Sequence, residues 1–220
     1  VDELRVADRA TVDDALYFGD LPYALRSDDA AAPAPLAAPA DAQDRWRAAL
    51  GAAGPAPYLA VAWRAGTDFT AGPELGRNLQ ALSKSVPVDA FAPALGAWPG
   101  TLVAVQRAPR AGELEVLARA SGRPVLDAVR ANADLEDMTA LLAACDAYAG
   151  VSSTNVHLLA SLGRPAAVVV PFPPEWRWMH DGETSPWFPT MRLLRARPAT
   201  PWRASLDGLL ATLDEARRVH

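Results

Sequence analysis

The sequence has few of the residues and runs that mark several common protein classes. It contains one cysteine, Cys145, which excludes an internal disulfide and a cysteine-rich zinc site. Its formal net charge is −5, so the chain lacks the basic character that nucleic acids or an anionic membrane surface require. Its apolar runs are far shorter than a membrane span, and no signal-peptide pattern opens the chain. We therefore expect a cytoplasmic protein with no membrane span and no nucleic-acid partner.

Histidine and lysine are also scarce. The three histidines, His157, His180 and His220, have no partners at metal-ligand spacing, so we expect no metal site. Of the 21 basic residues, only one is a lysine, Lys84. Most lysines are exposed surface residues, and that interpretation stays open for Lys84 until its place in the fold is considered.

Motifs of several nucleotide-binding and hydrolytic enzymes are absent. No GxGxxG follows a predicted strand and the chain has no GxxxxGK[ST], which argues against a dinucleotide-binding fingerprint and a P-loop kinase. It also has no GxSxG, the nucleophile elbow of many hydrolases.

What the sequence does contain is a regular alternation of apolar runs and helical stretches. Hydrophobic residues make up 50% of the 220 residues, which is enough for a large core. An amphipathic helix is predicted over residues 205–219. Runs typical of strands buried on both faces, with helical stretches between them, occur at residues 58–63, 101–106, 124–128 (the weakest), 147–152 and 166–171. This alternation predicts a doubly wound α/β domain with a parallel sheet over residues 55–220.

Residues 1–54 precede this domain. Their first part, 1–26, has a loosely helical pattern, and residues 27–41 are rich in alanine and proline. Because proline lacks an N–H and restricts its predecessor, this stretch predicts a semi-rigid linker. Asp41 is the predicted N-cap of a short helix that ends at Gly51.

Two loops are placed to bind an anion, since ligands of open parallel sheets lie at the carboxyl ends of the strands. The loop after strand 58–63 is too long for a plain strand-to-helix connection and contains Arg64, Thr67 and Lys84. At residues 152–154, hydroxyl side chains lead straight into a helix, whose free N–H groups and dipole form a phosphate seat. The simpler alternative for this turn is an ordinary serine or threonine N-cap.

A stretch rich in tryptophan and proline over residues 171–195 contains three of the seven tryptophans. Its aromatic residues, beside Glu175, Arg177 and Asp181, are suited to stack on and hydrogen-bond a sugar or a base. They are equally suited to form a rigid, proline-braced cap on the core. The sequence leaves both interpretations open.

The segments "LEDMTALLAACD" and "AYAGVSSTNVHLLASLGRPAAVVVPFPPEWRWMHDGETSPWFPTMRLLR" together resemble the donor-binding C-terminal half of GT-B glycosyltransferases. The pattern is most similar to bacterial tetratricopeptide-repeat glycosyltransferase-like proteins, which are related to lipopolysaccharide heptosyltransferases and, distantly, to O-GlcNAc transferase. The fragments "VAWRAGTDF" and "SKSVPVDAF" fit the same pattern, and "WRW" with "SPWFP" is its most specific part. The resemblance covers residues 57–195 and implies one Rossmann-like half of a GT-B fold, preceded by a short helical segment.

The resemblance also implies a phosphate site. Lys84 stands at the position of a lysine that contacts the donor diphosphate. His157 lies at a ribose-proximal or phosphate-proximal position. The turn that opens the phosphate-binding helix corresponds to Ser152, Ser153, Thr154 and Asn155. Many relatives have Asp-Thr where Ser153 and Thr154 stand, so an acidic group is absent from this turn.

Further positions follow from the same resemblance. Gln106, Asp137 and Met138 fall near the nucleotide base, although many relatives have Asp-Thr where Asp137 and Met138 stand. Arg64 and Thr67 belong to a loop that faces the cleft.

The function that the resemblance implies is glycosyl transfer from a nucleotide-diphosphate sugar, without a metal or other cofactor, to a protein or glycan acceptor. GT-B enzymes have two Rossmann-like domains, and the acceptor site and catalytic base usually lie in the N-terminal one. Residues 1–54 are too few to form that domain. We interpret them as the tail of a missing acceptor domain in a longer protein, which also carries a repeat domain in some relatives, since the chain begins with Val1 rather than methionine.

Two other classes remain as alternatives. One is a non-catalytic interaction module in which the fold is kept and the donor site has drifted, which the altered phosphate turn favours. The other is a nucleotide-binding epimerase or hydrolase of related fold, for which the sequence has no motif. No residue is identified as the catalytic base.

Overall fold

The computed structural model describes residues 24–26, 32–65, 84–197 and 200–218. Contacts divide the chain into two units, Val1–Ala31 and Ala32–His220. In the first unit only residues 24–26 are described, so most of the predicted N-terminal helical pattern lies outside the described residues. The larger unit carries the sheet and the helices that cover it.

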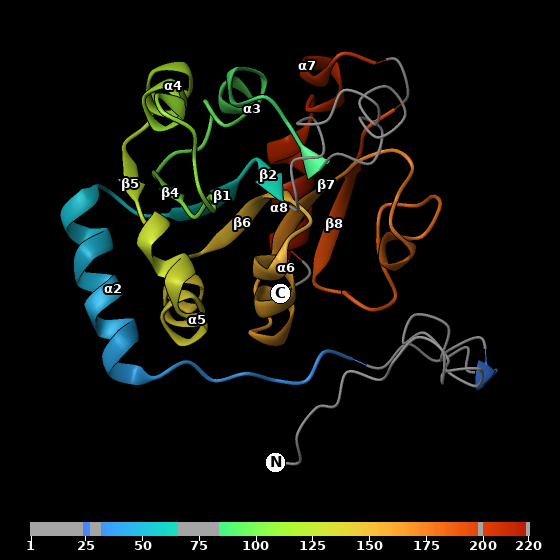
Figure 1. Cartoon of the computed structure of the whole chain (residues 1–220), viewed down its shortest axis with the longest axis horizontal. Helices are drawn as coiled ribbons and strands as arrows, with labels where there is room; N and C mark the ends of the chain where they lie inside the picture. The colour runs from blue at the N-terminus through green and yellow to red at the C-terminus, as the bar shows by residue number, and fades with distance from the viewer. Residues whose placement is uncertain (1–23, 27–31, 66–83, 198–199, 219–220) are drawn as a thin grey trace, which may run out of the picture. The chain divides into compact units, whose positions relative to one another are not determined.

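A six-stranded sheet forms the middle layer of the larger unit (Figure 1). Its strand order is β5-β4-β1-β6-β7-β8, and every neighbouring pair is parallel. The strands are β1 (Tyr58–Ala62), β4 (Thr101–Ala104), β5 (Val125–Asp127), β6 (Ala147–Val151), β7 (Ala166–Val170) and β8 (Met191–Arg195). The strands predicted from the apolar runs are confirmed, each slightly shorter than its run.

The edge strand β8 was not predicted from the sequence. Met191 and Leu193 are buried, whereas Arg192 and Arg195 are only partly buried. These arginines interrupt the apolar run by which the other strands were recognised. A strand at the sheet edge needs fewer apolar residues than a central parallel strand, so its pattern is a weaker signal.

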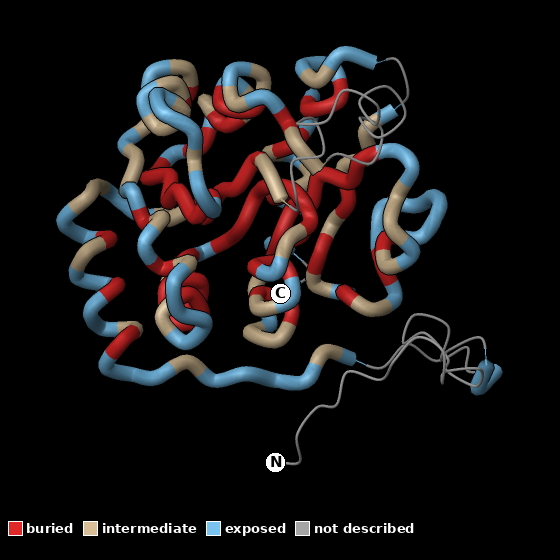
Figure 2. The backbone as a smooth tube through the Cα atoms, in the orientation of Figure 1, coloured by how far each residue is buried: buried red, intermediate tan, exposed pale blue. Residues whose placement is uncertain are grey.

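Helices cover both faces of the sheet (Figure 1), and Figure 2 shows the central strands β1, β4, β6 and β7 buried along most of their length. Successive residues of β1 alternate between two core clusters, with Ala60 in the first and Leu59 and Val61 in the second. One face carries α2 (Ala40–Ala53), α5 (Leu135–Ala144) and α6 (Thr154–Ser161); the other carries α3 (Val88–Ala94), α4 (Glu113–Ser121), α7 (Trp202–Ser205) and α8 (Leu209–Arg218). The predicted doubly wound, Rossmann-like α/β fold is confirmed. Within the described ranges, none of the helices combines the length and apolar character that crossing a bilayer needs.

The predicted boundaries of α2 are wrong. The helix begins directly after Pro39, whose carbonyl accepts a helical hydrogen bond, and Asp41 is therefore not the N-cap. Asp41 lies in the first turn and pairs with Arg45 at 2.8 Å. The helix also continues through Gly51 and ends at Ala53, with Gly54 as its C-cap.

The helix predicted over residues 205–219 is confirmed as α8, but it begins four residues later than predicted. Ser205 belongs to the preceding helix α7, and residues 206–208 separate the two helices. Gly208 has a φ of +84°, a left-handed conformation that glycine adopts without strain and that interrupts a right-handed helix.

The order in which the chain adds strands to the sheet reverses between β1 and β6. From β1 the chain proceeds outward through β4 to the edge strand β5, and from β6 it proceeds outward through β7 to the other edge strand, β8. A Cβ added at Gly150 of β6 would lie 2.1 Å from the carbonyl oxygen of Ala62 in the neighbouring β1, so only glycine lets the strands lie this close. Ligands of such sheets bind in the crevice beside strand ends where the connections diverge.

Helix α2 packs on the same sheet face as α5. Trp46 and Leu50 are 3% and 0% exposed, and both belong to the core cluster that contains Tyr148 of β6. The Trp46 indole N–H donates to a carboxylate oxygen of Asp137 in α5 at 2.9 Å. A helix that the sequence analysis placed ahead of the α/β domain therefore contributes to its core.

Truncation of Leu50 tests this packing. Leu50→Ala should lower the free energy of unfolding by about 2–5 kcal/mol, because it leaves a cavity in a fully buried site. Chemical unfolding monitored by circular dichroism measures the change. Leu36→Ala is the matched control, since Leu36 is 46% exposed, and it should change stability by less than about 0.5 kcal/mol. Equal stability of the two variants would contradict the burial of α2.

Candidate functional site

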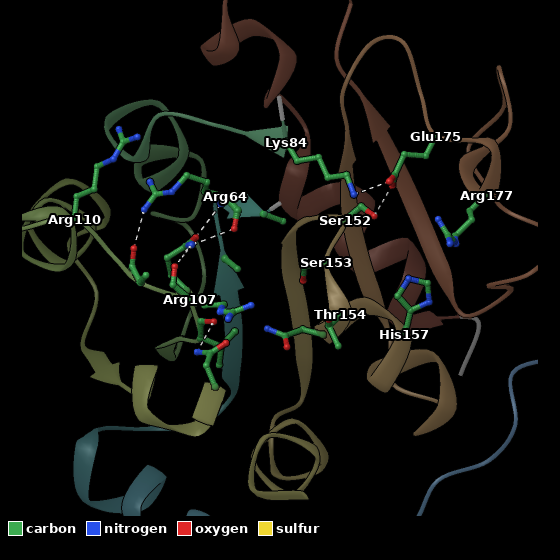
Figure 3. A pocket seen from close by; sticks show the side chains of 17 residues that line it. Arg64, Lys84, Arg107, Arg110, Ser152, Ser153, Thr154, His157, Glu175 and Arg177 are labelled. Carbon is green, nitrogen blue, oxygen red and sulfur yellow. Dashed lines mark hydrogen bonds and ion pairs between the residues drawn. The ribbon is translucent and has the colours of Figure 1, made fainter. Parts of the chain in front are cut away.

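A cavity of about 720 Å³ lies at the carboxyl ends of β1, β4 and β6, beside the point where the connections diverge (Figure 3). Its walls come from the segments that follow these strands and β7, and from β3 (Lys84–Ser85). Of the residues selected from the sequence, those that line it are Arg64, Lys84, Gln106, Ser152, Ser153, Thr154, Asn155 and His157. The structure thus brings together residues that are widely separated along the chain.

The cavity concentrates positive charge in a chain whose formal net charge is −5. Glu175 is the one carboxylate among the described residues that line it. The cationic side chains in its lining are Arg64, Lys84, Arg107, Arg110 and Arg177. A concave site whose charged lining is mostly cationic attracts ligands of the opposite sign, so an anion is the ligand type that this cavity favours.

A short antiparallel ribbon holds Lys84 at the cavity. β2 (Arg64–Ala65) pairs with β3, with Ala65 opposite Lys84. The Lys84 side chain is only 24% exposed, and its Nζ lies 2.6 Å from Oε1 of Glu175 (Figure 3). The interpretation of Lys84 as an ordinary solvated residue is therefore wrong.

Glu175 is held by three donors. Besides the Lys84 ammonium, Ser152 Oγ donates to Oε2 at 2.9 Å and the Trp178 indole N–H donates to Oε2 at 3.2 Å. Burial raises the pKa of Glu175, but the contacts with Lys84, Ser152 and Trp178 outweigh it and bring the pKa below its usual value. The carboxylate is therefore ionised at neutral pH.

The N-terminus of α6 forms the wall beside this ion pair. Ser153 is the N-cap residue in an extended conformation, and its side chain makes no capping hydrogen bond. The alternative of an ordinary serine cap is thus not realised here. Ser153 and Thr154 face the cavity (Figure 3), so the positive end of the helix dipole adds to the cationic lining.

His157 lies one turn further along α6. Its ring packs edge-on against Phe188, with ring centroids 5.3 Å apart. Desolvation lowers the pKa of His157, and the nearby Arg177 charge lowers it further, against the opposing effect of Glu175. The imidazole is consequently neutral at neutral pH and offers one donor and one acceptor to the cavity.

Arg64 lines the cavity but is tied to a partner within the protein. Its Nη1 lies 2.7 Å from Oε1 of Glu113 and its Nη2 donates to Oε2 at 3.1 Å. The two side chains are only 12% and 13% exposed. Burial raises the pKa of Glu113, but hydrogen bonds from Arg64 and from the Arg110 backbone N–H outweigh it, and the pKa lies below its usual value. Arg64 thus braces the wall of the cavity.

Gln106 also has a structural task that the sequence did not reveal. Its Oε1 accepts hydrogen bonds from the backbone N–H groups of Trp63 and Arg64 at 3.0 and 2.8 Å. Its Nε2 donates to the backbone carbonyls of Arg64 and Arg107 at 3.1 and 2.8 Å. Both donors and both lone pairs of the amide are used, so the side chain has none left to recognise a base. It fixes the end of β1 to the end of β4.

Two of the selected residues, Asp137 and Met138, do not line the cavity. Asp137 accepts the Trp46 indole N–H, and Met138 is 2% exposed within the core. Thr67 lies outside the described residues. The sequence missed Arg107 and Arg110, although their position directly after strand 101–106 matches that of Arg64 after strand 58–63.

The Trp- and Pro-rich stretch contributes both a cap and part of the lining. Trp178 is fully buried against Phe188, with ring centroids 5.0 Å apart. Arg195 of β8 donates to the carbonyls of Trp178, Met179, Asp181 and Gly182, which fixes the loop on the sheet edge. Glu175 and Arg177 reach the cavity from the same loop. The proline-braced cap interpretation therefore holds for Trp178, while the neighbouring charged residues face a ligand-sized space.

Comparison with known proteins gives a fold relationship. No protein-family model matches the chain, and no curated protein matches it. Among solved structures it is similar to the glycosyl transferase family 9 protein from Veillonella parvula, with a TM-score of 0.58 and 12% sequence identity. The match covers 84% of this chain and 54% of that one, so this chain spans about half the length of the solved protein. The chain therefore shares the α/β fold of that protein, whereas the specific resemblance to tetratricopeptide-repeat and O-GlcNAc transferases stays a prediction.

The Arg64–Glu113 pair predicts how stability depends on pH. Because the folded-state pKa of Glu113 is lowered, its contribution is complete above the unfolded-state value of about 4.3 and is lost as pH falls through the folded-state pKa. Glu113→Gln should cost about 3 kcal/mol at pH 7, since it leaves a mostly buried arginine unpaired. Below pH about 4.5 the stability of the variant should fall less steeply than that of the parent.

Urea unfolding at a series of pH values measures both effects. Glu115→Gln is the matched control, because Glu115 is an exposed glutamate in the same first turn of α4. Parallel pH profiles for the parent and Glu113→Gln would contradict the assignment.

Proposed function

We propose that this chain is the donor-binding half of a glycosyltransferase, and that the cavity binds the diphosphate of a nucleotide-sugar donor. One observation supports the proposal above all others. A mostly cationic cavity includes the N-terminus of α6, whose cap residue makes no side-chain hydrogen bond, in a fold similar to that of a glycosyltransferase. The volume of about 720 Å³ is in the range of small-molecule sites and leaves room for a nucleoside and a sugar beside the diphosphate.

The charges in the cavity suit the chemistry of glycosyl transfer. When the bond between the sugar and the diphosphate breaks, negative charge builds up on the leaving diphosphate. Lys84, Arg177 and the N–H groups at the start of α6 would stabilise that charge where it develops. Because these groups belong to the protein, we propose that the transfer needs no metal ion.

A second domain would hold the acceptor site and the catalytic base. The family 9 protein is about twice as long as the matched region, which supports a second domain that would hold both. Helix α2, within residues 1–54, packs into the core of the donor-binding half and belongs to it. The acceptor, a protein or a glycan, approaches the cavity from the side of the second domain.

A non-catalytic interaction module is the second candidate. It is favoured by the internal partners of Arg64 and Gln106 and by the absence of Asp137 and Met138 from the lining. In such a module the fold persists while the donor site has lost its function. The two candidates differ in whether a nucleoside diphosphate binds.

Nucleotide binding tests the proposal directly. In a thermal-shift panel of UDP, GDP, ADP, CDP and TDP, at least one nucleotide should raise the melting temperature, and calorimetry should then give its affinity. Lys84→Ala should weaken that affinity by roughly 10- to 100-fold, the effect of about 1.5–3 kcal/mol for a charge-assisted contact.

Two controls separate the site from general charge effects. Lys84→Arg keeps the positive charge and should retain most of the affinity. Arg47→Ala removes an exposed cation on α2, outside the cavity lining, and should leave affinity unchanged. If no nucleotide shifts the parent protein, the non-catalytic module becomes the better description.

Metal independence has its own test. Among the described residues, no group of three or more His, Cys, Asp or Glu side chains is arranged to hold a metal ion. The affinity for the nucleotide found in the panel should therefore be the same in excess EDTA and in millimolar Mg²⁺. A more than tenfold loss of affinity in EDTA would show that the cationic side chains do not suffice.

A further inference from the structure

Glu175 occupies an unexpected place for a carboxylate. It lies in a cavity whose other charged lining residues, within the described part of the chain, are cationic. Its Oε1 accepts from the Lys84 ammonium at 2.6 Å, and its Oε2 accepts from the Ser152 hydroxyl at 2.9 Å. Figure 3 shows both donors directed at the carboxylate. An ammonium and a hydroxyl beside the α6 N-terminus are the donors that a phosphate group would use.

We infer that Glu175 is a specificity-determining residue that holds the phosphate-binding donors in the absence of ligand and releases them only to an anion that also reaches further donors of the cavity. The identity of the ligand rests on the proposed function. A singly charged anion offers Lys84 no more charge than the carboxylate that it must displace. A diphosphate carries more charge, and its second phosphate also reaches donors that Glu175 does not use, at Arg177 and the start of α6.

Discrimination by a repulsive group is a common source of specificity. Glu175 is held by donors from three separate elements, β3, the end of β6 and the loop after β7, so its carboxylate stays close to any anion that enters. Two like charges a few ångström apart repel strongly in a half-buried site, because the surrounding protein screens them less than bulk water does.

The opposite role would be that of a positioning residue. Glu175 would then orient Lys84 toward the ligand, and its loss would weaken binding. That effect amounts to the added rotamer freedom of one lysine side chain, whereas removal of the carboxylate abolishes a direct repulsion of the ligand. The repulsion is the larger effect, so neutralising Glu175 should strengthen binding.

The experiment is a calorimetric comparison of the parent and Glu175→Gln with inorganic phosphate, inorganic pyrophosphate and the five nucleoside diphosphates. Glu175→Gln should bind pyrophosphate about tenfold more tightly than the parent. Inorganic phosphate reaches fewer donors than pyrophosphate, so it should bind the parent too weakly to measure and should bind Glu175→Gln measurably. Glutamine keeps a carbonyl oxygen for Ser152 and Trp178, and unfolding midpoints verify that the variant is folded.

Two further variants isolate the effect. Glu183→Gln removes the same charge from an exposed position in the same loop, outside the cavity lining, and should behave as the parent does. The double variant Lys84→Ala/Glu175→Gln should lose the gain, because the donor that Glu175 released is then missing.

The outcomes separate the inference from the proposed function. If nucleoside diphosphates bind the parent but Glu175→Gln binds pyrophosphate no more tightly, the inference is overturned and the function stands. If the variant gains affinity for pyrophosphate but no nucleoside diphosphate binds either protein, the inference about Glu175 is supported and the proposed donor-binding function is overturned. If no anion binds either protein, both are overturned.

Discussion

Where β1 and β6 pair, the carbonyl oxygen of Ala62 lies so close to Gly150 that no side chain fits between the strands. This close pairing sets the geometry of the crevice in which the two halves of the sheet diverge. The segment after β1 carries Arg64 to one side of it, and the turn after β6 carries Ser152 to the other. Gln106 then ties the end of β4 to the end of β1, so the three strand ends form one rigid floor.

The charges around this floor are arranged as two internal ion pairs with different exposure. Arg64 and Glu113 are almost fully enclosed. Loss of either partner would leave the other as an unpaired buried charge, which is strongly destabilising. Lys84 and Glu175 are roughly twice as exposed and face the cavity directly. The first pair braces a wall, whereas the second presents its charges to whatever enters. This difference in solvent access gives Lys84 and Arg64 distinct roles, although both are cations at the same cavity.

The likeness to a family 9 glycosyltransferase at 12% identity establishes a fold, and a fold is compatible with many functions. The proposed phosphorylated ligand is therefore supported by the cavity rather than by the fold. Its cationic lining, the open start of α6 and the neutral imidazole of His157 all favour an anion with further hydrogen-bonding groups. These features support the proposed nucleotide-sugar donor.

The sequence by itself determined the central strands and the side of the sheet at which a ligand would lie. Parallel strands buried on both faces are short apolar runs, and the residues after them meet at one edge whatever the details of packing. Local sequence could not reveal β8, whose arginines interrupt its apolar pattern, or the start of α2, where Pro39 rather than Asp41 precedes the helix. Only the tertiary structure decided that Glu113 binds Arg64 and that Glu175 binds Lys84. Ion pairs between residues far apart in the chain depend on distances that exist only once the sheet has brought the strand ends together.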